Sequence, residues 1–263
     1  MTTQSDSIVE LGDASSQESD ARPKRAAAWS PRARARLAGV FEALEGSASA
    51  IPQQAILGGM VVSSAAATAT NILSNQQLYW LGFALSVLGV GFHLAWAFLF
   101  YQLMRVVNRT IAGLAAFAIL TCCAIQAVTA LLYLGPLIVL TRESSMTAFS
   151  TAQVQQLAGV FVDLNSRAYQ VDLVFFGFWC ILTGFLIARS TFLPRILGVL
   201  LMIDGIGWAT FMVPPFANAI FPAIAIASGL AEIPLMLWLI IFGVNNERWK
   251  EQARLAEASP HAH

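Results

Sequence analysis

Residues 79–103 read YWLGFALSVLGVGFHLAWAFLFYQL and contain no Asp, Glu, Lys or Arg. An α-helix rises about 1.5 Å per residue, so about 20 apolar residues cross a hydrocarbon core of about 30 Å. This segment is therefore long enough and apolar enough to span a bilayer. It must do so as a helix, because lipid offers no partner for an unpaired peptide group and the segment lacks the alternation of a barrel strand.

The composition of the whole chain also favours a membrane protein. Of the 263 residues, 57% are hydrophobic and 11% are charged, and the mean hydropathy is +0.66. A soluble domain carries about 25% charged residues. The chain contains neither a Gly-rich phosphate loop followed by Lys-Ser or Lys-Thr nor a dinucleotide-binding fingerprint. These observations exclude an ordinary soluble nucleotide-dependent enzyme.

Four further segments have the length and apolar character of residues 79–103. They are residues 111–134, 168–188, 196–213 and 219–244. A sixth segment, residues 37–60, is more polar, because it contains Glu42, Glu45, Pro52, Gln53 and Gln54. We count it as the first span. The predicted fold class is therefore all-α, a polytopic transmembrane helix bundle with six spans over residues 37–244.

The positions of Lys and Arg predict the orientation, because positive charge beside a span is retained in the cytoplasm. On one side lie Arg22, Lys24, Arg25, Arg32, Arg34, Arg36, Arg105, Arg109, Arg189, Arg195, Arg248, Lys250 and Arg254. Arg142 and Arg167 fall on the other side. Only an even number of spans places the cations before the first span and those after the last span on the same side of the membrane. We predict a multi-pass protein of the cell (inner) membrane with both termini in the cytoplasm.

The two flanking regions are predicted to be cytoplasmic. Residues 1–36 are rich in Ser, Asp, Glu and cations. Such a composition cannot bury a core, so this arm is predicted to be disordered. A polybasic segment beside a span attracts anionic lipid, which we expect as its partner. Residues 245–263 form a tail, and neither flank has the basic reading surface typical of a nucleic-acid-binding protein.

Two segments on the outer side are too polar to span but have a helical pattern. Residues 63–77 are rich in Ala, Thr and Asn, and residues 150–167 begin with Ser and Thr and place apolar residues at helical spacing. We interpret both as amphipathic helices that lie on the membrane surface or cover the end of the bundle. The alternative is that they are only structured connections.

Several collinear segments resemble a known family. They are residues 65–73 (AAATATNIL), 173–177 (LVFFG), 184–187 (GFLI), 192–201 (FLPRILGVLL) and 229–239 (GLAEIPLMLWL). Together they are similar to the bacterial membrane proteins of the domain-of-unknown-function 4386 family, over roughly residues 36–245. The resemblance implies a multi-span bacterial cell-membrane protein. It implies no established activity, substrate or catalytic residue.

Ionisable residues inside predicted spans are the candidate functional residues. His93, Asp204 and Glu232 fall near mid-depth, and Asp172 lies nearer the outer surface. Burying one charge at the bilayer centre costs about 2.5–3.5 kcal/mol, and no Lys or Arg lies at the same depth. His93 is the one candidate cationic partner. We therefore expect these residues to form a ligand- or proton-binding cluster, with a purely structural hydrogen-bonded cluster as the alternative.

The helix faces around these residues predict where they point. Gly82, Ser86, Gly89 and His93 form one small and polar stripe, and Ala225, Gly229 and Glu232 form another. Such stripes predict close contact with a neighbouring helix. Glu42 and Glu45 lie near the predicted inner end of the first span. We expect them to be solvated there, with the lining of a cytoplasmic entrance as the alternative.

Three classes of function agree with this pattern. A transporter or channel would use the mid-depth residues as a relay or ligand site. A membrane-embedded enzyme would need a nucleophile, and Ser86 near His93 is a weak candidate. A sensor or scaffold would use the two flanks to bind partners. A metal site is not predicted, because the single intramembrane His has no second His one turn away, and the sequence indicates no cofactor, catalytic residue or oligomeric state.

Overall fold

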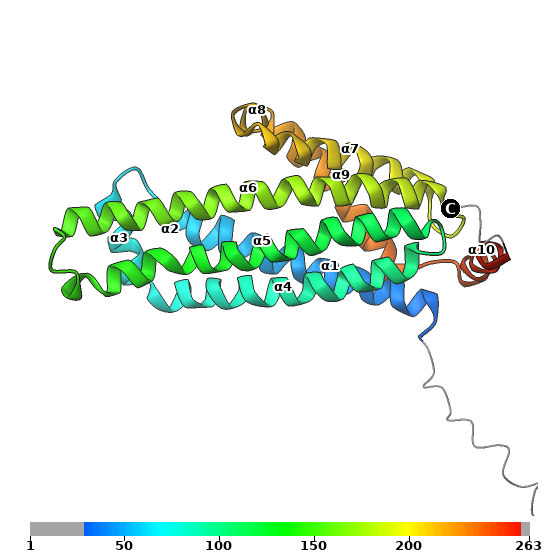
Figure 1. Ribbon diagram of the computed structural model, residues 1–263, viewed down its shortest axis with the longest axis horizontal. Helices are drawn as coiled ribbons and strands as arrows, with labels where there is room; N and C mark the ends of the chain where they lie inside the picture. The colour runs from blue at the N-terminus through cyan, green and yellow to red at the C-terminus, as the bar shows by residue number, and fades with distance from the viewer. Residues whose placement is uncertain (1–28, 259–263) are drawn as a thin grey trace, which may run out of the picture.

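The computed structural model describes residues 29–258, which form α-helices joined by short turns (Figure 1). No strand occurs within this range. The helices are α1 (Pro31–Ala50), the π-helix η1 (Ile51–Leu57), α2 (Gly58–Met60), α3 (Ala65–Ser74), α4 (Gln76–Met104), α5 (Arg109–Thr141), the 3-10 helix η2 (Glu143–Ser145), α6 (Thr151–Arg189), α7 (Arg195–Ala209), the 3-10 helix η3 (Thr210–Met212), α8 (Pro214–Ala219), α9 (Phe221–Ile241) and α10 (Asn246–Ala258).

Five helices of the described chain are long and apolar enough to cross a membrane. They are α4, α5, α6, α7 with its extension through Met212, and α9. Their outer faces carry large apolar side chains, such as Phe117, which is 71% exposed, and Leu131 and Ile226. A soluble surface rarely carries so many contiguous apolar groups, whereas lipid solvates them well. The prediction of an all-α fold with apolar helices that could span a membrane is confirmed, with five such helices among the described residues.

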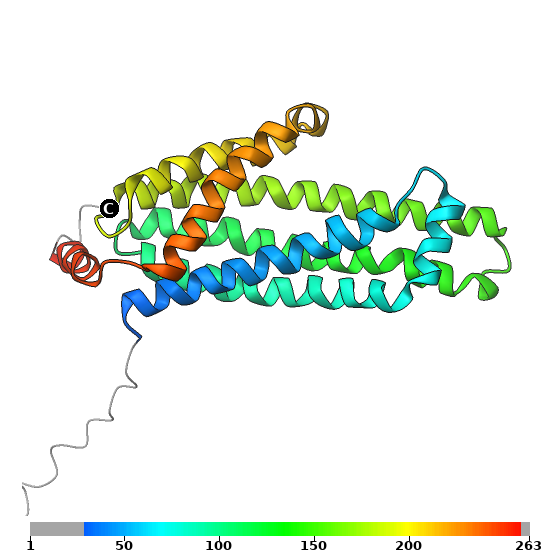
Figure 2. The ribbon, with the colours of Figure 1, turned by 180° about the vertical axis from the view of Figure 1, so that it is seen from behind.

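The predicted first span is helical but differs from the other five. Helix α1, η1 and α2 form one continuous run from Pro31 to Met60, which lies alongside α4 (Figure 2). The π-helical segment begins one residue before Pro52. Proline has no N–H to continue the α-helical ladder, so a wider turn at this point is expected. The polar residues of α1 keep this run out of the group of five apolar spans.

The two predicted amphipathic helices have different outcomes. Helix α3 is the short helix expected within residues 63–77, and it packs Thr68, Ala69 and Ile72 against the end of the bundle. The separate helix predicted for residues 150–167 is wrong. These residues form the first half of α6, which continues without a break to Arg189 and begins with a capping box between Ser150 and Gln153. Their apolar face packs on α5 instead of lying on a membrane surface.

Both ends of the described chain lie at one end of the bundle, which we call the basic end (Figure 2). The Arg32 amide donates to Asn246 Oδ1 (2.8 Å), and Trp249 Nε1 donates to the Leu103 carbonyl (3.0 Å). The Thr191 amide donates to Gln252 Oε1 (3.0 Å). These bonds join the start of α1, the end of α4, the α6–α7 turn and α10. The opposite end, which we call the far end, holds α3 and the α5–α6 turn (Figure 1).

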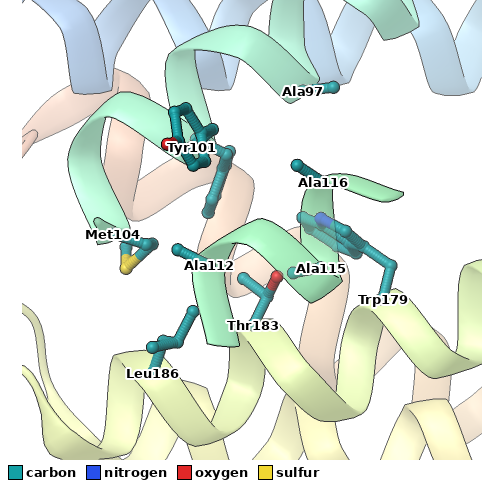
Figure 3. A pocket seen from close by; sticks show the side chains of 10 residues that line it. Ala97, Tyr101, Met104, Ala112, Ala115, Ala116, Trp179, Thr183 and Leu186 are labelled. Carbon is teal, nitrogen blue, oxygen red and sulfur yellow. The ribbon is translucent and has the colours of Figure 1, made fainter. Parts of the chain in front are cut away.

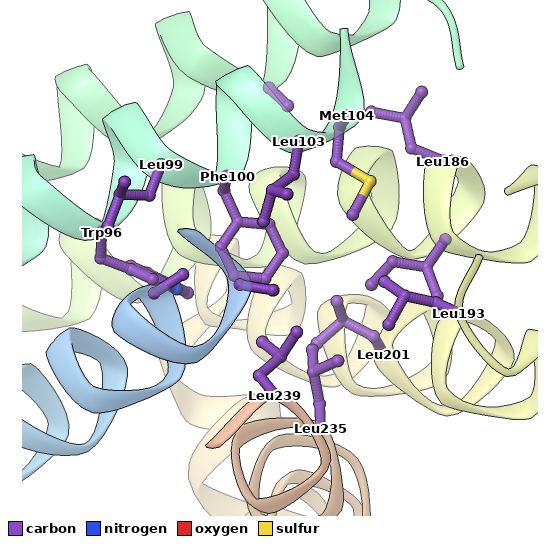
Figure 4. Close-up of a cluster of buried hydrophobic side chains, with 14 of the residues drawn as sticks. Trp96, Leu99, Phe100, Leu103, Met104, Leu186, Leu193, Leu201, Leu235 and Leu239 are labelled. Atoms are coloured by element: carbon purple, nitrogen blue, oxygen red, sulfur yellow. The ribbon is translucent and has the colours of Figure 1, made fainter. Parts of the chain in front are cut away.

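Two of the three apolar cores of the described residues occupy the two ends of the bundle, and the third, smaller one is formed by Phe211, Ala217 and Ile224. The basic-end core contains Trp96, Phe100, Leu103, Met104, Leu186, Leu193, Leu201, Leu235 and Leu239, among others (Figure 4). The far-end core contains Ile56, Leu57, Met60, Ile72, Tyr79, Tyr133, Leu137 and Val154, among others. Helix α4 runs from Tyr79 in one core to Leu103 in the other. The residues of α4 between Phe83, which packs against the far-end core, and Trp96, which belongs to the basic-end core, therefore lie in a layer between the two cores.

Helices α6 and α7 approach so closely that glycine is required at their contact. A Cβ atom on Gly205 would lie 2.5 Å from the Gly177 carbonyl oxygen, and one on Gly184 would lie 2.6 Å from the Gly198 carbonyl oxygen. No real Cβ tolerates such distances from backbone atoms. The four glycines therefore pair reciprocally along the antiparallel hairpin, and α7 is held against α6 by backbone contact.

We expect Gly205→Ala to destabilise the protein by about 1–3 kcal/mol, since the added methyl group overpacks a backbone contact that cannot yield without moving a helix. Gly113→Ala on α5 is the matched control, because nothing lies within 4 Å of its Cβ position. Alanine there should stabilise the helix by about 0.5–1 kcal/mol. Thermal unfolding in detergent measures both. Equal melting temperatures for the two variants would contradict the packing described.

Candidate functional site

His93 lies at the centre of a polar group between the four helices α1, α4, α5 and α6. Its side chain is 1% exposed. Its Nδ1 atom lies 3.0 Å from Gln126 Oε1 on α5 and 3.5 Å from Glu45 Oε1 on α1. The Glu45 side chain is 12% exposed. The histidine therefore has both an amide and a carboxylate as close neighbours.

The hydrogen bonds around Glu45 define which ring nitrogen of His93 carries a proton. Gln126 Nε2 donates to Glu45 Oε1 (3.0 Å), and Ser49 Oγ donates to the same oxygen (2.7 Å). An ionised carboxylate only accepts, so Gln126 presents its NH₂ to Glu45 and its carbonyl oxygen to His93. His93 then donates from Nδ1. We call Glu45, Ser49, His93 and Gln126 the histidine network.

The other ring nitrogen of His93 remains without a partner. Nε2 is buried and makes no hydrogen bond among the described residues. The ring packs at 5.1 Å from the Trp96 ring, which in turn lies 4.4 Å from that of Trp179. With Nδ1 occupied, Nε2 holds a free lone pair in a largely apolar setting. This atom is where a second proton would bind.

A small polar cavity adjoins the network on its far-end side. It is lined by Ser49, Gln53, Ser86, Gln126, Thr129, Ala130 and Tyr169. Its volume of about 20 Å³ is enough for about one water molecule, and polar groups from all four helices line it. Glu45 and Ser49 on α1 and Gln53 on η1 follow one another at four-residue spacing, so they form a polar stripe along this continuous run. The polar layer thus extends from His93 toward the far-end core.

Asp172 lies next to this layer on α6. Its side chain is 3% exposed, and Cys122 Sγ lies 2.7 Å from its Oδ1 atom, at which the thiol donates. Cys122 and Gln126 are four residues apart on α5, so they share a helix face. Asp172 therefore lies beside the histidine network, on the face of α5 that carries Cys122 and Gln126. The sequence did not predict that Cys122 would contact a candidate acid.

Asp204 and Glu232 form a second polar group, which we call the acid pair. Glu232 accepts from Trp208 Nε1 (3.1 Å) and Ser228 Oγ (2.8 Å). Asp204 is fully buried, and neither of its carboxylate oxygens has a hydrogen-bond partner among the described residues. Helices α7 and α9, which carry the two acids, pack against each other. Glu232 thus has Trp208 and Ser228 as partners and Asp204 has none among the described residues, whereas His93 has Glu45 and Gln126.

Helix α1 carries two acids, Glu42 and Glu45. Glu45 belongs to the histidine network. Glu42 lies one turn earlier, and its Oε2 atom is buried without a hydrogen-bond partner among the described residues. A Cβ on Gly39 would lie 2.9 Å from the Leu239 Cβ atom, so α1 and α9 are in close contact here. The expectation that Glu45 is solvated at the edge of a span is therefore wrong. In the sequence, the four-residue spacing of Glu45, Ser49 and Gln53 was the pattern that could have indicated a polar face turned toward another helix.

The two predicted small-residue stripes also differ in outcome. On α4, a Cβ on Gly89 would lie 3.3 Å from Ser49 Oγ, so this stripe does face a neighbouring helix. On α9, nothing lies within 4 Å of the Cβ position of Gly229, so close packing predicted at that residue is wrong. The α4 stripe brings α1 near enough for Glu45 to reach His93. The α9 stripe has no such role.

An apolar crevice lies on the basic-end side of the aromatic residues (Figure 3). Ala97, Tyr101, Met104, Ala112, Ala116, Trp179 and Leu186 line it, among others. Its volume is about 10 Å³, less than one water molecule needs with polar partners. This crevice is a packing defect between α4, α5 and α6, and the polar layer is the candidate site.

A comparison with protein families matches residues 37–243 to the model described as Domain of unknown function (DUF4386). The chain belongs to this family. The match includes every residue of the histidine network and of the acid pair, and it confirms the family predicted from the sequence motifs. No curated protein and no solved structure matches the chain. The description of the family gives no activity.

We expect Gln126→Leu to destabilise the protein, because it removes the closest acceptor of the His93 Nδ1–H and one of the two donors to Glu45 Oε1. An unsatisfied buried polar group costs about 1–3 kcal/mol. Thr121→Val on the same helix is the control, since its exposed hydroxyl bonds only to the Phe117 carbonyl of its own helix. Chemical unfolding in mixed micelles measures the difference. Equal stability of the two variants would contradict the network.

Proposed function

We propose that this chain is a six-span protein of the cell membrane, with its basic end in the cytoplasm, and that His93 and Glu45 bind a proton that is moved through the bundle. The observation that carries the proposal is the buried and unpartnered Nε2 of a histidine whose Nδ1 already faces Gln126 and Glu45. An imidazole held in this way accepts a proton at one defined atom.

The charge distribution supports the proposed orientation. At the basic end lie Arg32, Arg34, Arg36, Arg105, Arg109, Arg189, Arg195, Arg248, Lys250 and Arg254. Arg142 lies in the α5–α6 turn at the far end, and Arg167 lies on α6 between the two ends. Cations beside spans are retained in the cytoplasm, so the basic end belongs on that side. Of the basic arm, residues 1–28 lie outside the described residues, and we propose that the arm contacts anionic lipid.

Cysteine labelling in intact cells tests this orientation. We expect Ser144→Cys, in the α5–α6 turn, to react with a membrane-impermeant maleimide. Ala33→Cys on α1 and Glu257→Cys on α10 should react only after permeabilisation. The chain without substitution is the control, because all three native cysteines are buried. Labelling of Ala33→Cys and Glu257→Cys on opposite faces would contradict an even number of spans.

A proton at His93 Nε2 would be stabilised by its neighbours. The imidazolium would have the Glu45 carboxylate 3.5 Å from Nδ1, which offsets part of the cost of burying a charge in the bundle. Ser49 and Gln126 hold that carboxylate in place. We propose that a proton reaches this site by way of the polar cavity beside Gln126, with Asp172 and the acid pair as further candidate stations.

Both approaches to this site are closed by apolar side chains. Trp96, Phe100 and Leu103 follow His93 on α4 toward the basic end, and all are buried. Toward the far end, Tyr79 packs on Tyr133 with ring centroids 4.7 Å apart, and its hydroxyl donates to the Tyr133 carbonyl. The arrangement is that of an occluded site. Transport would open one core at a time.

The alternative functions have less support from the geometry. An enzyme would need an activated nucleophile, but the Ser86 hydroxyl donates to the Gly82 carbonyl (2.9 Å) and not to His93. A sensor or scaffold would not need the network to move protons at all. Proton flux is therefore the measurement that separates the proposed function from these two classes.

We expect the purified protein in vesicles with an internal pH dye to carry a proton flux driven by a membrane potential. His93→Gln and Glu45→Gln should each reduce the flux to the level of protein-free vesicles, because each removes one half of the proton site. Glu247→Gln is the control, since its carboxylate lies on the exposed helix α10. Unchanged flux in His93→Gln, or no flux in the unsubstituted protein, would contradict the proposal.

A further inference from the structure

A groove at the basic end is built from residues that the proton site does not use. It lies where α1 begins, between the α6–α7 turn and the α9–α10 turn, and its volume is about 320 Å³. Its polar lining includes Arg32, Thr191, Asn245 and Arg248, and its apolar lining includes Trp238 and Phe242. This volume falls at the low end of the range for ligand-binding sites, about 300–1,000 Å³.

The two arginines are anchored but keep most of their donors free. Arg32 Nε donates to the Val244 carbonyl (3.4 Å), and Arg248 Nη1 donates to the Thr191 carbonyl (3.3 Å). A guanidinium has five N–H donors in a rigid fork, so each arginine retains donors for a further acceptor. Neither side chain forms a salt bridge among the described residues. The groove therefore presents two uncompensated positive charges.

Gly243 makes this arrangement sterically feasible. It ends α9 with a φ of 67°, in the left-handed region that glycine adopts without strain. A Cβ atom there would lie 2.9 Å from Arg32 Cγ and 3.0 Å from the Arg32 carbonyl oxygen. Only a glycine lets the start of α1 cross the end of α9 at this distance. The groove is thus a feature of the backbone and not only of flexible side chains.

The lining of the groove is amphipathic in a way that fits a lipid. No Asp or Glu is among the residues that line it. Beside the arginines, the rings of Trp238 and Phe242 pack with centroids 4.7 Å apart at the end of the apolar helix α9. Arginine binds phosphate through paired N–H donors, and aromatic rings suit the boundary between headgroup and acyl chain. A free inorganic anion would need only the arginines and not the aromatic rings.

We infer that this groove binds one anionic phospholipid, with the phosphate between Arg32 and Arg248 and the acyl chains along Trp238 and Phe242. The inference needs the apolar helices to lie in a bilayer, but it does not depend on the proton site. Arg32 and Arg248 both lie outside residues 37–243, the part that the family model matches. The lipid site is thus formed where the family region meets the flanks of this chain.

Native mass spectrometry of protein extracted from vesicles of equal phosphatidylglycerol and phosphatidylcholine tests the inference. We expect one phosphatidylglycerol to remain bound to the unsubstituted protein, in preference to phosphatidylcholine. The double variant Arg32→Gln, Arg248→Gln should lose it. The double variant Lys250→Gln, Arg254→Gln removes the same charge from α10 outside the groove and should keep it. The single variant Arg248→Gln changes only an exposed side chain, so it should fold normally, and it should lose part of the bound lipid.

A second measurement separates lipid from a free anion. Phosphatidylglycerol should raise the melting temperature of delipidated protein in nonionic detergent, and inorganic phosphate at the same concentration should not. Equal stabilisation by inorganic phosphate would overturn the inference in favour of a simple anion site. Equal loss of lipid from the α10 control variant would overturn it in favour of general charge attraction. Full retention of lipid by the groove variant would also overturn it.

Discussion

The requirement that a buried carboxylate and a buried imidazole satisfy one another organises this bundle. Glu45 and His93 come from α1 and α4, and Gln126 of α5 bonds to both. Burying either polar group without a partner is costly, so the helices that carry them must stay in register. The small residue at Gly89 lets α1 come close enough for this contact. The polar character of α1, which makes it a poor span by composition, is what supplies the network.

The position of the network between two apolar cores gives the molecule its layered organisation. Along α4 the order is Tyr79, Ser86, His93 and Leu103, which passes from the far-end core through the polar layer to the basic-end core. Each core excludes water from the layer, and this strengthens the interactions inside it. The same exclusion closes the site at both ends. Stability and any transport activity therefore make opposite demands on the same aromatic and leucine side chains.

The acid pair and the groove at the basic end depend on the second half of the chain. The glycine contacts between α6 and α7 hold α7 against the bundle, and α9 packs on both α7 and α1. Asp204 and Glu232 are brought together by this arrangement. Gly243 then turns the chain across Arg32, which joins the last helices to the first. Backbone contact through glycine thus positions both polar sites of this half.

The sequence by itself determined the helical fold, the five apolar spans and the family, because hydropathy and motif are properties of each segment alone. It also singled out His93, Asp172 and Asp204, which are buried in the bundle, and Glu232, which is partly buried. Only the tertiary structure decided that His93 meets Glu45 and Gln126, and that residues 150–167 continue α6. An amphipathic pattern is the same for a surface helix and for one packed on a neighbour. Pairing across helices depends on their register, which no single segment encodes.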